Sequence, residues 1–147
     1  MEVKRTSIII PAIVSVIGVL NRTLVRLPGV GKKIVAVSSR SVGRMIPHLS
    51  RFGFLKEPSY ENAVWNWDLF LDLIGADYEK EEAEDSVTEY KIFKCPAGFC
   101  RPEHIDACEA TMECDHSLVD TSGANLVVEK CFPNDGICVE KVIAVDI

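Results

Sequence analysis

The chain has 147 residues, of which 48% are hydrophobic and 26% charged, and its formal net charge is −6. This length suits one domain that buries its own core, and the high apolar content without low-complexity tracts excludes an intrinsically disordered protein. The charge is uneven, because residues 1–56 hold ten Lys or Arg against one acidic residue, whereas the rest holds six basic and 21 acidic residues. This asymmetry favours either a polyanion or membrane surface as a partner of the first part, or a basic helical layer packed beside an acidic one.

An uncharged apolar segment begins at Ser7 and ends at Leu20, with the sequence SIIIPAIVSVIGVL. A basic start before an apolar run is typical of a signal sequence, but no small-residue cleavage site follows. As a helix the segment would span about 21 Å, which is shorter than a hydrocarbon core of ~30 Å. We therefore predict no transmembrane span. The segment is expected to be buried or covered by a partner, such as a second subunit or a membrane surface.

Two helices are predicted before residue 57. The first covers residues 11–26, because Pro11 is tolerated in a first helical turn and Pro28-Gly29 stops the helix. The second covers residues 32–52, with Pro47 marking an interruption or its end. Its apolar positions recur at mixed three-, four- and five-residue spacing: Ile34, Val37, Val42 and Met45.

The third helix has the clearest boundaries, with Ser59 as the N-cap and Gly75 as the C-terminal stop. Residues 79–85 are predicted to be an acidic linker, and residues 86–95 a strand. A helix over 102–119 precedes two strands, 124–132 and 137–147, which flank the turn sequence PNDG and form an antiparallel hairpin.

The predicted order is α-α-α-β-α-β-β. It indicates an α+β fold in which N-terminal helices pack on a C-terminal antiparallel sheet with one helix inserted. We expect a single domain over residues 1–147, with a basic helical half (1–78) and a Cys-rich α+β half (86–147).

All six cysteines lie in the C-terminal third of the chain: Cys95, Cys100, Cys108, Cys114, Cys131 and Cys138. No CxxC pair occurs, which excludes zinc ribbons, classical zinc fingers and thioredoxin-like motifs. The hairpin brings Cys131 near Cys138, and the preceding helix and strand offer Cys108 and Cys95, so a zinc site is one interpretation. Inert packing of buried thiols is the other. Disulfides are disfavoured because we expect a cytoplasmic protein, where thiols stay reduced.

The stretch over residues 90–142 resembles the C-terminal part of the L-2-amino-thiazoline-4-carboxylic acid hydrolase-like family. More distantly, it is similar to 4-vinyl reductase-type small-molecule-binding domains. The matching positions are Cys95, Cys108 or Cys114, Asp115, Gly136 and Cys138. The resemblance implies a ligand pocket between helices and sheet. Its hydrolase branch implies addition of water to a cyclic amidine, with Cys114, Asp115 and His116 as catalytic candidates. The other branch implies a ligand sensor without catalysis, holding a structural zinc.

The segment from Leu27 to Lys33 has the sequence LPGVGKK and looks like the hairpin of a helix-hairpin-helix nucleic-acid-binding motif. Gly29 and Gly31 would let backbone N–H groups point at a phosphate, and Lys32 and Lys33 add positive charge. An ordinary turn between two helices explains the same residues. Nucleic-acid binding is therefore the alternative function.

Overall fold

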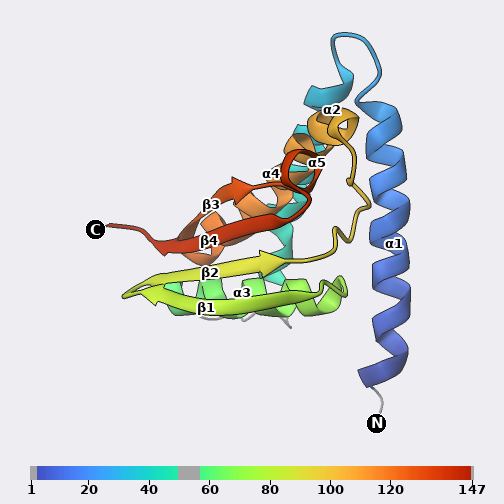
Figure 1. Cartoon of the computed structure of the whole chain (residues 1–147). Helices are drawn as coiled ribbons and strands as arrows, with labels where there is room; N and C mark the ends of the chain where they lie inside the picture. Colours follow the sequence, from blue (N-terminus) through green and yellow to red (C-terminus); the bar gives the residue numbers. More distant parts are fainter. Residues whose placement is uncertain (1–2, 50–56, 147) are drawn as a thin grey trace.

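The computed structural model describes residues 3–49 and 57–146, and it places helices against a four-stranded antiparallel sheet (Figure 1). The α-helices are α1 (Val3–Leu24), α2 (Gly31–Met45), α3 (Tyr60–Leu73), α4 (Ile105–Ser122) and the single turn α5 (Phe132–Asp135). The strands are β1 (Tyr78–Glu84), β2 (Val87–Ile92), β3 (Ala124–Lys130) and β4 (Cys138–Ala144), in the spatial order β1-β2-β4-β3. Two 3₁₀ turns cover Ile46–His48 and Pro102–His104. The predicted α+β class is confirmed, and so is the helix inserted between strands.

The prediction of an acidic linker over residues 79–85 is wrong, because residues 79–84 belong to strand β1. This strand pairs with β2 from Tyr78 opposite Ile92 to Glu84 opposite Val87. All its side chains after Tyr78 are exposed, so the alternation of apolar and polar residues that marks a half-buried strand is missing. Backbone pairing holds β1 in place, and its acidic side chains discourage pairing with another chain at this sheet edge. The observed order of the main elements is therefore α-α-α-β-β-α-β-β.

Helix α1 begins at Val3, well before the predicted start at Pro11, which lies inside the helix. An internal proline removes one helical hydrogen bond, so tertiary packing must offset its cost. A Cβ atom placed on Gly75 would lie 3.0 Å from Cγ of Pro11, which shows that the proline ring packs against the end of α3. Figure 1 shows α1 standing beside the helix-and-sheet body, with the connection after β2 running along it.

Helix α2 ends at Met45, immediately before the 3₁₀ turn that contains Pro47, so the prediction that Pro47 marks its end is confirmed. The last part of the predicted helix, residues 50–52, lies outside the described residues. The predicted apolar positions are all about half exposed or more, and the buried positions are instead small residues four apart: Gly31, Val35, Ser39 and Gly43. A Cβ on Gly43 would lie 2.1 Å from the carbonyl oxygen of Cys114. The small residues therefore allow α2 to approach α4 closely.

Helix α3 starts as predicted, with the backbone N–H of Asn62 donating to Oγ of Ser59 at 3.0 Å. Its buried face supplies Trp67 and Leu71, each 1% exposed, to the main core. The rest of that core comes from α4 and from the inward face of the sheet: Tyr90, Ile92, Leu118, Val119, Ala124, Leu126, Cys138 and Val142. The core thus lies between α3, α4 and one face of the sheet.

Strands β3 and β4 form the predicted hairpin, and its turn sequence folds as α5, which is capped by Gly136 with φ +68°. In β4 the even-numbered residues Cys138, Glu140 and Val142 are buried, as are the residues opposite them in β2. On the opposite face, Lys141 pairs with Glu129 of β3 at 2.7 Å. The alternation places one acidic residue, Glu140, on the buried face of the sheet.

Candidate functional site

A cavity of about 370 Å³ lies where α1, α2, α3, α4 and the sheet meet. Its wall is mainly apolar: Ile10, Val14 and Ile17 of α1, Phe70 and Ile74 of α3, and Phe99 and Phe132 from the connections. This volume is at the lower end of the range of small-molecule pockets, and an apolar wall with a few polar groups is their usual composition. A cavity thus lies between the helices and the sheet, where the resemblance implies a ligand pocket, and ligand binding there stays a prediction.

One face of helix α4 and one face of strand β4 bring the polar groups to this cavity. Thr111, Met112 and Asp115 lie three, four and seven residues after Cys108 on α4, so the four side chains share a face. Cys114 borders the cavity as well, although it is adjacent to Asp115 in sequence. From β4 come Cys138 and Glu140, which are two residues apart and lie on the same side of the strand.

Glu140 is 1% exposed and has an incomplete set of hydrogen bonds. The thiol of Cys138 donates to Oε1 at 3.2 Å, while Oε2 is buried without a hydrogen-bond partner. Burial raises the pKa of Glu140 to about 7, and the thiol hydrogen bond opposes part of that rise. Loss of solvation favours the neutral form of a carboxyl group, which explains the direction.

Asp115 is half-buried on α4 and borders the cavity. Its pKa is raised well above the usual range of an aspartate, first by burial and then by the nearby charge of Glu140. Two carboxyl groups that interact in this way do not readily ionise together. Among the cavity-lining residues that the structure describes there is no Lys, Arg or His to neutralise them.

The four cysteines predicted as zinc ligands belong to two different hydrophobic clusters. Cys95 and Cys131 pack around Cys108 in a small cluster that includes Phe99, whereas Cys138 belongs to the main core. All six cysteines are free thiols. Within residues 3–49 and 57–146, no three His, Cys, Asp or Glu side chains are arranged to hold a metal ion. The structure thus gives no support to the zinc site predicted at Cys95, Cys108, Cys131 and Cys138, which stays a prediction.

The catalytic candidates are also separated. Cys114 and Asp115 line the cavity, but His116, the next residue on α4, is not among its lining residues. Burial raises the pKa of the Cys114 thiol, and it raises that of Cys108 to about 12, so both thiols are protonated at neutral pH. A protonated thiol is a poor nucleophile. Asp115 is therefore the candidate whose position and chemistry the cavity supports best.

Sequence reasoning missed Glu140, which is the most completely buried carboxyl group of the cavity. A signal was present: Glu140 lies two residues from both Cys138 and Val142 in a predicted strand, so all three had to share one face. Strand alternation alone would have placed a carboxyl group among core residues. That combination is rare in proteins unless the acid has a partner or a function.

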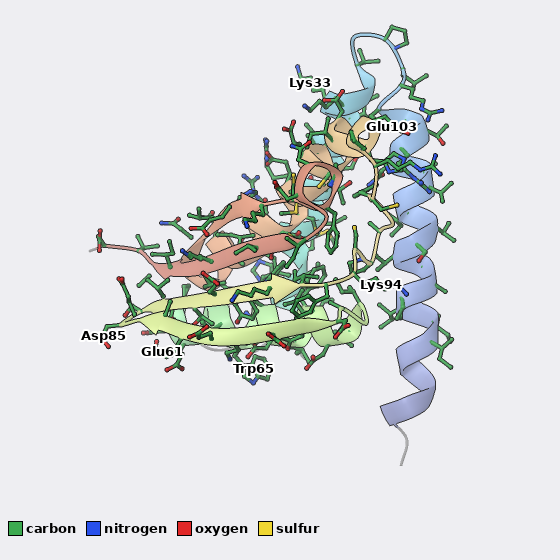
Figure 2. All side chains as sticks on the ribbon, viewed as in Figure 1. Lys33, Glu61, Trp65, Asp85, Lys94 and Glu103 are labelled. Carbon is green, nitrogen blue, oxygen red and sulfur yellow. The ribbon has the colours of Figure 1, made fainter. Side chains whose placement is uncertain are left out.

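The turn predicted as a nucleic-acid-binding hairpin joins α1 to α2. Gly29 has φ +76°, a conformation that favours glycine, and a Cβ on Gly31 would lie 2.0 Å from the carbonyl oxygen of Leu24. Lys32 donates to Asp106 at 3.0 Å and to Glu109 at 2.6 Å, and both acidic residues lie on α4. Lys33 lies at the outer end of the molecule (Figure 2). One of the two predicted phosphate-binding lysines thus ties α2 to α4, and nucleic-acid binding stays a prediction.

Comparison with known proteins identified no family for this chain. No protein-family model matches the chain, and the search of curated proteins found no match. The resemblance to thiazoline-carboxylate hydrolases and 4-vinyl reductase-type domains therefore stays a prediction.

Helix α1 keeps much of its apolar surface exposed although it forms one wall of the cavity. Ile8 is 72% exposed and Val16 68% exposed. None of the described helices is long and apolar enough to cross a membrane. The expectation that residues 7–20 contact a second subunit or another partner stays a prediction.

Proposed function

We propose that this chain binds a small, largely apolar molecule in the cavity between its helices and its sheet, without converting it chemically. The observation that carries this proposal is the cavity itself, with its volume of about 370 Å³ and its aromatic and aliphatic wall. Burying apolar ligand surface there is favourable by roughly 25 cal/mol per Å² before the costs of association. The free thiols of all six cysteines also support our expectation of a cytoplasmic protein.

Binding without catalysis fits the chemistry of the lining better than the hydrolase interpretation does. A 2-amino-thiazoline-4-carboxylate carries a carboxylate, and the described lining residues supply two carboxyl groups but no cationic side chain to receive it. The thiols are protonated and His116 lies outside the lining. We therefore expect no consumption of 2-amino-thiazoline-4-carboxylate. Turnover that slows in the Asp115→Asn variant would establish the hydrolase instead.

The binding proposal is tested by filling the cavity from α1. Val14 lines the cavity, whereas Val16 is 68% exposed on the same helix and is not part of the lining. We expect isothermal titration calorimetry to detect binding of 2-phenylethanol to the unmodified chain and to Val16→Trp. Binding should be lost in Val14→Trp, because the indole ring occupies the space that the ligand needs.

Near-ultraviolet circular dichroism of both tryptophan variants would check that each retains its tertiary packing. Equal binding by Val14→Trp and Val16→Trp would show that the ligand binds elsewhere. No binding of 2-phenylethanol or of its charged analogues to the unmodified chain would refute the proposed function.

A further inference from the structure

Two carboxyl groups in the cavity have no role in binding an apolar molecule. Asp115 borders the cavity from α4 and Glu140 from β4, so two separate elements bring acidic side chains to one cavity. Burying a carboxyl group costs free energy unless it is hydrogen-bonded or paired with a cation. Buried acidic groups of this kind cluster at binding and catalytic sites. The pair therefore calls for a partner that the chain itself does not provide.

The carboxyl oxygens of Asp115 and Glu140 accept fewer hydrogen bonds than they could. Glu140 receives one hydrogen bond, from the thiol of Cys138, and its Oε2 atom has none. Within the described ranges, burial and the charge of Glu140 act on the carboxyl group of Asp115, and no side-chain hydrogen bond contributes. Two other polar groups of the lining are used internally, because Asn21 donates to Thr111 at 2.9 Å and Ser38 donates to the carbonyl oxygen of Ile34, whereas Nε1 of Trp67 is a buried donor without a partner. Glu140 therefore lacks a hydrogen-bond donor for Oε2. A positively charged donor would also stabilise the ionised form of both carboxyl groups.

We propose that the molecule bound in the cavity has an apolar body and a protonated amine, and that the amine donates hydrogen bonds to Asp115 and Glu140. This inference rests on the proposed function, because it uses the same cavity. The apolar body would pack against the aromatic side chains of the wall, which include Trp67, Phe70 and Phe99. A primary ammonium group has three donors on one atom and can bridge two carboxylates. Binding of the ammonium group favours the ionised form of both carboxyl groups, whereas a carboxylate ligand brings no positive charge that would stabilise that form.

Three probes of similar shape separate the contribution of the amine from that of the apolar body. We expect calorimetry to rank 2-phenylethylamine above 2-phenylethanol by at least ten-fold in affinity, with 3-phenylpropanoate not detectably bound. Glu140→Gln should weaken binding of the amine at least ten-fold, because the variant loses the charge but keeps the shape. The same variant should leave binding of the alcohol within about two-fold, since the apolar wall is unchanged.

Two further variants keep this test decisive. Glu129→Gln is the matched control, because Glu129 pairs with Lys141 on the opposite face of the sheet and should not affect either ligand. Asp115→Asn should reproduce the loss of amine binding if Glu140→Gln does not fold. Equal affinities for amine and alcohol would overturn the inference and leave the proposed function standing. Failure of all three probes to bind would instead overturn the proposed function.

Discussion

Replacing Trp67 by alanine is expected to destabilise the protein by about 3 to 5 kcal/mol, which is the usual cost of deleting a buried tryptophan. Trp67 is 1% exposed, and its ring stacks on Phe70 with 5.4 Å between ring centroids. It also borders the cavity, so the space left by the indole would join an existing void. Its Nε1 group has no hydrogen-bond partner, and the loss is therefore one of packing and apolar burial. Urea unfolding measures the change.

Trp65 provides a matched control for this substitution, because it is the same residue type on the same helix and is 45% exposed. Its side chain projects from the edge of the molecule (Figure 2). Trp65→Ala should cost less than about 1 kcal/mol, in line with surface substitutions. Equal losses in the two variants would contradict the assignment of Trp67 to the core. The pair also shows why a tryptophan count says little until the helix face is known.

The parts of the fold that the sequence predicted correctly have strong local signals. Ser59 caps α3, Pro47 follows the end of α2, and the PNDG turn joins β3 to β4. Each of these signals acts within a few residues, through a hydrogen bond or a restricted backbone angle, so neighbouring elements matter little. The helix, strand and hairpin that follow residue 86 were found for the same reason.

The parts that failed depend on contacts distant in sequence. Strand β1 has no buried face of its own, and its existence follows from pairing with β2. Pro11 lies inside α1, where its ring packs against Gly75 at the end of α3. On α2 the apolar positions have a mixed spacing that defines no buried face, and the face packed on α4 consists mainly of small residues. Tertiary packing decided the outcome in all three cases.

The candidate site was half predictable for a similar reason. The resemblance implied a pocket between helices and sheet and singled out Asp115, which does line the cavity. It attached most weight to the cysteines, whose spacing in sequence does not show whether their side chains converge. The pairing of Asp115 with Glu140 joins an α4 residue to a β4 residue, and only the packing of helix on sheet brings them together.

Glu140→Gln is expected to remove much of the pH dependence of stability between pH 5 and pH 8. Burial raises the pKa of Glu140 to about 7 in the folded protein, whereas an unfolded glutamate titrates near its ordinary value of 4.5. The folded state therefore holds this proton more tightly, and folding loses stability as the pH rises from the unfolded pKa through the folded one. At pH 8 the raised pKa of Glu140 lowers the free energy of unfolding by about 3 kcal/mol. Asp115 acts in the same direction, because its pKa is also raised.

The comparison between variants isolates this effect from other titrating groups. The thiols of Cys138 and Cys108 face the pair but stay protonated throughout this range, because burial raises the pKa of each. Burial lowers the pKa of His104, which opposes the trend equally in all variants. Urea unfolding at several pH values should show that the unmodified chain and Glu129→Gln lose stability in parallel toward pH 8, while Glu140→Gln loses about 3 kcal/mol less. A Glu140→Gln curve parallel to the others would mean that Glu140 is already ionised in the folded protein at pH 5. A binding site for a cationic amine would then carry its negative charge permanently, at a cost in stability that the ligand relieves.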